Sequence, residues 1–170
     1  MDSADTQTVD TDAAVAAFSP SDTVKAKLDS MSVEQKVSQM FITRPEEITG
    51  VSRFTQAGNK TKDAIGTYPL GGFIFAKDNF FGEGATITMM SNIQKYAQDS
   101  IGVQMFLAVD EEGGDKSPLA AGNAYAQEKA QSELGGADEA GKSASNIAAY
   151  MKKSGLNMNL APVSLSLIHI

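Results

Sequence analysis

The chain has 170 residues, of which 42% are apolar, a net charge of −7 and no cysteine. This length suffices for one globular core, and the lack of Cys excludes a disulfide framework, thiolate metal sites and a Cys nucleophile. The acidic balance argues against a nucleic-acid surface and against binding to an anionic membrane. No apolar run reaches the roughly 18 residues of a membrane-spanning helix. The composition therefore favours a protein that acts on neutral or small molecules.

The first elements are expected from their capping signals. Residues 1–18 are rich in Asp, Thr, Ala and Ser and predict a disordered leader or linker. A helix is expected to begin at "SPSD", with Ser19 as its N-cap and Pro20 in its first position. "SVEQ", residues 32–35, matches a capping box and predicts a second, short helix. Apolar residues are expected to give that helix one face: Val33, Val37, Met40 and Phe41.

The next segments alternate between strand and helix patterns. "QMFIT" either ends the short helix or forms a buried strand, and Pro45 is expected to close the segment by disfavouring helix at Arg44. Further strands are expected at 71–76, 103–109 and 156–163, all apolar along their length, and the first of them is expected to be buried on both faces. Helices are expected at 51–65, at 87–97 with Ile87, Met90, Ile93 and Ala97 on one stripe, at 124–134, and at 138–154 before Gly155. This order is typical of an α/β fold with a parallel sheet and external helices.

The stretch "FLAVDEEGG", residues 106–114, places three carboxylates directly after an apolar strand. In α/β proteins ligands gather at the carboxyl ends of strands. Three interpretations stay open: a solvated loop, a divalent metal site, and a site for a polyol or sugar. Asp110 and Glu112 lie on the same side of an extended chain, roughly 6–7 Å apart, which suits hydroxyl binding. Two neighbouring exposed carboxylates offer no evident means of separating their pKa values, which disfavours a glycosidase acid/nucleophile pair.

Four ordered blocks resemble one known family. "FLAVDEEGG" resembles the "AVDxEGG" segment of glycoside hydrolase family 3, most closely its β-N-acetylhexosaminidase branch. "MSVEQKVSQMFITRPE" is similar to the opening block of that family, "GGFIFAKDN" to its second strand and "GLNMNLAPV" to its fourth. The resemblance covers about residues 22–164, so residues 19–164 are interpreted as the N-terminal half of the family's barrel domain.

The resemblance implies a partial (β/α)₈ barrel of about four βα units with parallel strands. It implies a retaining hydrolase that removes terminal β-linked N-acetylglucosamine from peptidoglycan fragments or chitooligosaccharides, without a cofactor or metal. Asp110 would hydrogen-bond sugar hydroxyls, while Glu111 and Glu112 would shape the loop or its polar network. Glu112 and Lys116 are further loop candidates for substrate binding. Gly113 and Gly114 would let the backbone pass close to the sugar.

The chain departs from the family pattern in two places. The family usually continues "GG-x-V-x-R", whereas this chain reads "GGDKSPLA", and Lys116 lacks the rigid fork of an arginine. The family's "KH-F-P-G-H-G"-like segment and its aspartate nucleophile do not occur in the 170 residues. The resemblance therefore assigns no catalytic residue here and implies a chain without turnover. A non-catalytic sugar-binding module is the alternative.

The two ends carry separate expectations. "LSLIHI", residues 165–170, matches the translation of a sequencing-library adapter, so we interpret it as an artefact and His169 as part of no site. The alternative is an authentic strand end with His169 packed in it. The leader resembles a spacer behind an export signal, which favours a location outside the cytoplasm. Half a barrel leaves apolar faces and strand edges uncovered, so the chain is expected to self-associate.

Overall fold

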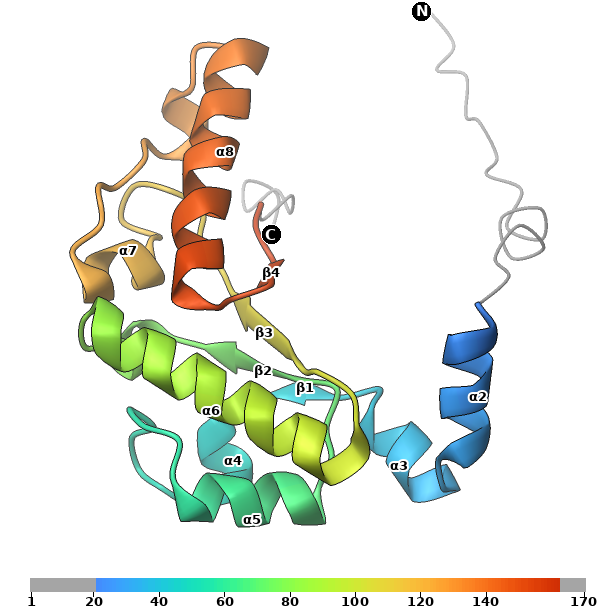
Figure 1. Ribbon diagram of the computed structural model, residues 1–170. Coiled ribbons are helices and arrows are strands. Elements are labelled where there is room, and N and C mark those ends of the chain that lie inside the picture. Colours follow the sequence, from blue (N-terminus) through green and yellow to red (C-terminus); the bar gives the residue numbers. More distant parts are fainter. Residues whose placement is uncertain (1–20, 163–170) are drawn as a thin grey trace, which may run out of the picture.

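The sheet has four parallel strands in consecutive order. The protein is represented by a computed structural model that describes residues 21–162 (Figure 1). The strands are β1 (Ile42–Thr43), β2 (Gly72–Phe75), β3 (Phe106–Val109) and β4 (Met158–Asn159), and each pairs with the next in parallel. A parallel sheet of four strands was predicted from the sequence and is confirmed. The leader and residues 165–170, including His169, lie outside the described residues.

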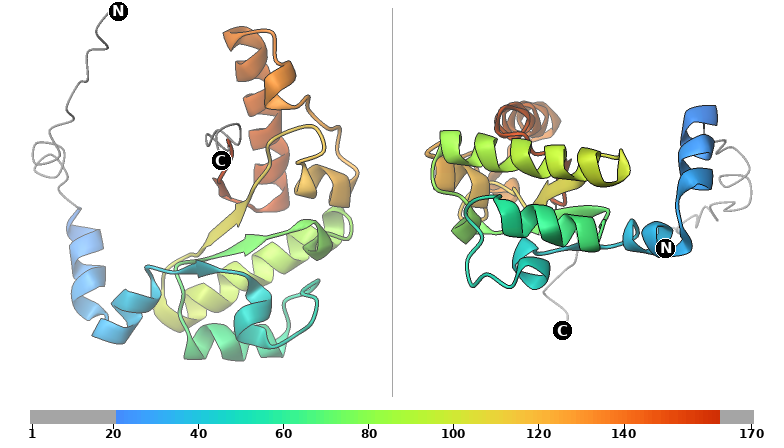
Figure 2. Two further views of the ribbon diagram at one scale, coloured as in Figure 1. Left: turned by 180° about the vertical axis from the view of Figure 1, so that it is seen from behind. Right: turned by 60° about the horizontal axis from the view of Figure 1, so that its bottom comes forward.

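Helices connect the strands and gather on one side of the sheet (Figures 1 and 2). The long helix α6 (Glu83–Ile101) joins β2 to β3, and α8 (Ala137–Ser154) leads into β4. Helix α8 ends at Gly155, which has a positive φ of 86°, as the sequence predicted. The remaining helices are α2 (Asp22–Ser30), α3 (Val33–Ser38), α4 (Pro45–Thr49), α5 (Asn59–Thr67), α7 (Pro118–Asn123) and the 3₁₀ turns η1 (Lys77–Asn79) and η2 (Gln131–Glu133).

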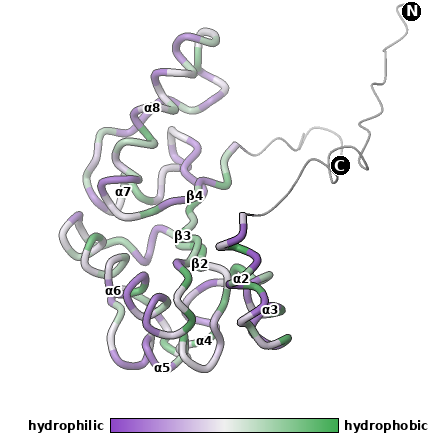
Figure 3. The backbone as a smooth tube through the Cα atoms, turned by 45° about the vertical axis from the view of Figure 1, so that its right-hand side comes forward, coloured by the Kyte–Doolittle hydropathy of each residue, from purple (hydrophilic) through white to green (hydrophobic). Residues whose placement is uncertain are grey.

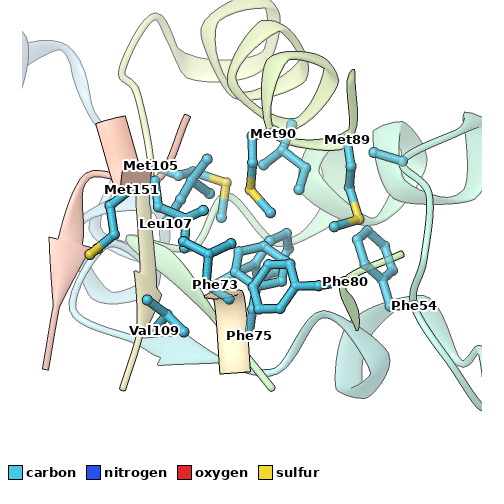
Figure 4. Packing of buried hydrophobic residues seen from close by; sticks show 14 of the residues in the cluster. Phe54, Phe73, Phe75, Phe80, Met89, Met90, Met105, Leu107, Val109 and Met151 are labelled. Carbon is cyan, nitrogen blue, oxygen red and sulfur yellow. The ribbon is translucent and has the colours of Figure 1, made fainter. Parts of the chain in front are cut away.

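The hydrophobic core lies between the sheet and these helices (Figure 4). Alternate residues of β2 and β3 face it, and Phe73, Leu107 and Val109 are completely buried there. On α6 the predicted stripe is buried at Met90, Ile93 and Ala97, whereas Ile87 is exposed. Pairs of aromatic rings, among them Phe73 and Phe75 with centroids 6.3 Å apart, fill the space beneath the sheet.

Two adjacent glycines let the strands approach each other closely. A Cβ on Gly71 would lie 2.1 Å from the carbonyl oxygen of Gln39, and one on Gly72 would lie 2.5 Å from that of Phe106. No side chain fits at such distances, because both contacts are with backbone atoms of neighbouring segments. The "GG" of "GGFIFA" is therefore a packing requirement of the sheet.

The second face of the sheet is open only at the amino ends of the strands. The expectation of burial on both faces holds for most of β2, where only Ile74 is half-buried, and Ala108 of β3 is completely buried on this second face. Ile42, Gly72 and Phe106 are register partners and so point to the same face. Phe106 is 54% exposed and Ile42 is exposed too. In the described residues helices cover one face, and the apolar side chains of Ile42 and Phe106 are exposed on the other.

The N-terminal helices contribute little to the core. Ser21, not Ser19, caps α2 by accepting a hydrogen bond from the Val24 amide, and Ser19 and Pro20 lie outside the described residues. The capping box of Ser32 and Gln35 is confirmed by both of its hydrogen bonds. The apolar face predicted for the second helix is solvent-exposed, and Figure 3 shows hydrophobic as well as hydrophilic stretches in α2 and α3. Helix α2 stands away from the body of the molecule (Figures 1 and 2).

The prediction for Pro45 is confirmed: Arg44 before it is extended, with a ψ of 139°, so the first segment ends there, and Pro45 then begins α4 because its fixed φ suits the first turn of a helix. Two helix predictions were wrong. The helix expected at 51–65 is α5, which starts only at Asn59. The helix expected at 124–134 does not form: α7 precedes this range, Ala124 ends α7 with a positive φ of 56°, and η2 is a single turn. Residues 124–130 run past the acidic turn instead, and that tertiary contact overrides their helix propensity.

We predict that the 170-residue chain self-associates through the open face of its sheet. Phe106→Lys should reduce the association, because a charged side chain on this face opposes its burial against another copy. Sedimentation velocity over a concentration series measures this. Tyr68→Lys is the matched control, since Tyr68 is also 54% exposed but ends α5. A monodisperse wild-type monomer at all concentrations would contradict the prediction.

Candidate functional site

The loops that follow three strands meet in one cleft at the carboxyl edge of the sheet. Because all four strands are parallel, their carboxyl ends lie at the same edge. The cleft has a volume of about 560 Å³, and its wall includes Arg44 after β1, Lys77 after β2 and Asp110 after β3. Its remaining lining residues are Ile74, Phe75, Ala76, Glu112, Asp115, Lys116, Ser117, Pro118, Ala121 and Gln127.

The structure brings all three predicted site residues together. Asp110 directly follows β3, is exposed, and lines the cleft with Glu112 and Lys116. A tight turn connects the last two, because the Glu112 amide donates to the Lys116 carbonyl over 2.8 Å and Gly113 pairs with Lys116 in a bridge. The acidic triplet thus belongs to an ordered turn at the mouth of the sheet.

The two glycines of this turn contact the chain itself. Gly113 has a φ of 89°, and a Cβ there would lie 2.1 Å from the Lys129 carbonyl oxygen. The Gly114 amide donates to the Glu128 carbonyl over 2.8 Å. The sequence resemblance implied that these glycines make room for a sugar. In the structure they make room for residues 128–130, which pass across the turn.

The middle carboxylate, Glu111, is turned inward and is completely buried. Its two oxygens accept hydrogen bonds from the amides of Leu119 (2.8 Å) and Ala120 (3.1 Å) in the first turn of α7. The Tyr150 hydroxyl of α8 donates a third over 2.9 Å. A loop-shaping role was expected for Glu111, and strand alternation placed it on the opposite side from Asp110 and Glu112, but the local sequence did not show which side would be buried.

Burial raises the pKa of the Glu111 carboxyl, and the hydrogen bonds from Leu119, Ala120 and Tyr150 offset part of that rise. Desolvation, and then the neighbouring charge of Glu111, raises the pKa of Tyr150 far above its usual range. The Tyr150 hydroxyl therefore stays protonated and acts as a donor. Its ring stacks on Tyr125 with centroids 5.2 Å apart, which fixes its position.

Asparagine side chains of the last strand hold β3 and the turn from the other side. Asn159 accepts from the Glu111 amide (3.0 Å) and donates to the Glu111 carbonyl (3.1 Å). Asn157 accepts from the Leu107 amide and donates to the Met105 carbonyl. The "NMN" of "GLNMNLAPV" thus adds side-chain hydrogen bonds to the short backbone pairing of β4 with β3.

A second buried polar side chain anchors the loop after β2. Asn79 is buried, donates to Glu46 (2.6 Å) and to the Phe54 carbonyl (2.8 Å), and accepts from the Ala76 amide (2.7 Å). The loop after β2 and the turn after β3 are therefore each held by the hydrogen bonds of a buried side chain, which places the exposed groups between them in defined positions.

Sequence reasoning missed Arg44 and Lys77 as cleft residues. Arg44 lies 3.7 Å from Glu46 through its Nε and also borders a neighbouring polar hollow with Arg53 and Asp78. Both missed residues directly follow predicted strands, so the rule that singled out Asp110 could have found them. Arg44 also supplies the cleft with a guanidinium group, which the "GGDKSPLA" segment does not.

The described part of the chain offers no group of three or more His, Asp or Glu side chains placed to hold a metal ion. Within residues 21–162, no helix is both long enough and apolar enough to cross a bilayer. The site is thus defined by carboxylates and cations around an open cleft, at the strand ends of a partial α/β barrel.

These features define an α/β protein with a polar cleft at the strand ends, and comparison with known proteins assigns the family. Residues 32–165 match the model described as "Glycosyl hydrolase family 3 N terminal domain". The chain belongs to this family. Comparison with curated protein sequences gave no significant match.

Solved structures support the assignment. A β-N-acetylhexosaminidase from Beutenbergia cavernae DSM 12333 matches with 28% identity and a TM-score of 0.62, over 78% of this chain and 38% of that one. A family 3 β-N-acetylglucosaminidase from Paenibacillus sp. str. FPU-7 matches with 23% identity and a TM-score of 0.68, over 78% of this chain and 24% of that one. Native NagZ from Neisseria gonorrhoeae matches with 17% identity and a TM-score of 0.53, over 71% of this chain and 34% of that one. The chain therefore spans well under half the length of each structure.

The raised pKa of Glu111 predicts a pH-dependent contribution to stability. The folded protein keeps this proton above the ordinary pKa of 4.5, where the unfolded chain has lost it. The contribution of Glu111 is thus fully present below that pH and falls as pH rises through the raised value. Urea unfolding of wild type and Glu111→Gln from about pH 4 to pH 7 should show the wild-type advantage shrinking. A difference that grows with pH would contradict it.

Proposed function

We propose that the chain is the N-terminal part of a retaining β-N-acetylglucosaminidase, and that its cleft binds the sugar released by that enzyme. The substrates would be terminal β-linked N-acetylglucosamine residues of peptidoglycan fragments or chitooligosaccharides. Family membership supports a glycosidase, and the names of the Beutenbergia and Paenibacillus structures support this sugar.

The observation that carries the proposal is the position of Asp110. Its carboxylate stands at the carboxyl end of β3, on the wall of a cleft that also receives Arg44 and Lys116. An ionised carboxylate accepts strong hydrogen bonds from vicinal hydroxyls, and the cations can donate to hydroxyl or acetamido oxygens. This mixture of carboxylate acceptors and cationic donors suits a neutral polyol better than it suits an anion.

In this proposal Asp110 binds and orients the sugar, while chemistry belongs to residues outside the described chain. Hydrolysis with retention needs a nucleophile and a general acid/base on opposite sides of the glycosidic bond. The carboxylates of this cleft all come from one turn of the chain after β3. The 170 residues are therefore assigned sugar binding and no turnover. The alternative, a module that binds sugar without any hydrolytic partner, shares this site.

Sugar binding should depend on Asp110. Asp110→Ala should weaken the binding of N-acetylglucosamine by about 2 kcal/mol, or roughly 30-fold, because it removes a charged acceptor. Isothermal titration calorimetry measures the affinity. Asp63→Ala is the control, since Asp63 is an exposed aspartate on α5, away from the lining of the cleft. Absence of binding to the wild type would remove the proposal.

An activity assay separates the two versions of the function. The chain alone should not hydrolyse an aryl β-N-acetylglucosaminide, whereas the longer protein from which it derives should do so. Robust hydrolysis by the 170 residues would overturn the proposal that this chain binds the sugar without cleaving it. Sugar binding together with an inactive longer protein would favour the binding module.

A further inference from the structure

Three consecutive carboxylates follow β3, but only two of them line the strand-end cleft. Asp110 and Glu112 are on its wall, whereas Glu111 between them is completely buried. Ionised groups are rarely buried unless hydrogen bonds compensate for lost water, and here both carboxylate oxygens are occupied. The burial of Glu111 costs desolvation free energy, and it occurs directly beside Asp110, on which the proposed function rests.

The hydrogen bonds of Glu111 connect the acidic turn to three separate elements. Its side chain binds the first turn of α7 and the Tyr150 hydroxyl of α8, and its backbone binds the Asn159 side chain of β4. The two helices are themselves fixed elsewhere, because Leu119 of α7 and Met151 of α8 are buried in the hydrophobic core, and β4 is fixed by its pairing with β3. Residue 111 therefore cannot rotate without breaking contacts to all three.

Fixing residue 111 also fixes its neighbours. Successive side chains of an extended segment point to opposite sides, so turning Glu111 inward turns Asp110 and Glu112 outward to the cleft. The bond between the Glu112 amide and the Lys116 carbonyl then closes the turn. Asp110 itself appears in none of the side-chain hydrogen bonds of the described residues, so its direction comes from the backbone that carries it.

We propose that Glu111 is a positioning residue, which holds Asp110 in its sugar-binding direction by anchoring the acidic turn to α7, α8 and β4. It does not touch the sugar. The role of Asp110 in this inference rests on the proposed function, whereas the anchoring of the turn can be measured without any sugar.

The experiment uses two variants of the 170-residue chain that weaken the anchor to different degrees. Glu111→Ala removes all three side-chain hydrogen bonds. Tyr150→Phe removes only the third, and it keeps the aromatic ring that stacks on Tyr125. Tyr150→Phe thus keeps the test open if Glu111→Ala does not fold. Glu34→Gln is the control, because it changes an exposed carboxylate on α3.

Amide hydrogen exchange tests the anchor directly. Glu111→Ala should accelerate exchange at Leu119 and Ala120 and in the turn 110–117, and Tyr150→Phe should do so to a smaller extent. The amides of Met90 and Ile93 in α6 should keep their protection, which shows that the fold is intact. Unchanged exchange in the turn of a folded variant would overturn the proposal.

Sugar affinity tests whether the anchor positions Asp110. At a temperature where all variants are folded, Glu111→Ala should weaken N-acetylglucosamine binding by about tenfold, as expected for a group that orients a binding residue. Faster exchange with wild-type affinity would overturn the positioning role and leave Glu111 a purely structural one. If the wild type binds no sugar, the proposed function fails, and exchange still decides whether Glu111 anchors the turn.

Discussion

The parallel pairing of β2 with β3 is the constraint on which the rest of the molecule depends. Four residues of each strand are in register, from Gly72 with Phe106 to Phe75 with Val109. This register sends Phe73, Phe75, Leu107 and Val109 into one core and brings the two following loops to the same edge. Because parallel strands end together, polar residues far apart in the sequence share a cleft. Gly72 is required for it, since its neighbour across the sheet leaves no room for a Cβ.

Buried polar groups then convert a shared edge into a defined site. Asn79 anchors the loop after β2, and Glu111 with Asn159 anchors the turn after β3. The hydrogen bonds of these buried side chains offset the free-energy cost of removing them from water. Loss of a single partner would therefore leave a buried polar atom unsatisfied and would destabilise the loop. The exposed groups of the cleft, Asp110 and Arg44, occur between these anchors. The scaffold supplies geometry, and the surface residues supply the chemistry of recognition.

In contrast to the polar cleft, the open face of the sheet is apolar. Ile42 and Phe106 show that the strands carry apolar side chains toward a side that no described helix covers. A family 3 chain that spans 24–38% of the two related glycosidase structures fits this picture of an incomplete barrel. The open face of the sheet and the cleft at its carboxyl edge have the same cause, because both belong to the inner surface of the partial barrel. The proposed recognition of a sugar and the exposure of apolar surface are thus linked in this chain.

Local sequence determined the elements whose signals are local. The capping box at Ser32, the glycine stop at Gly155 and the apolar runs of β2 and β3 each act through neighbouring residues, so the sequence alone located them. The acidic triplet at the end of β3 marked the site for the same reason. Tertiary structure decided what local signals cannot: that 124–130 crosses the turn instead of forming a helix, that Arg44 joins the cleft, and that Glu111 faces inward. Three adjacent carboxylates are chemically alike until α7 and α8 supply donors to one of them, and only the packed chain brings those donors there.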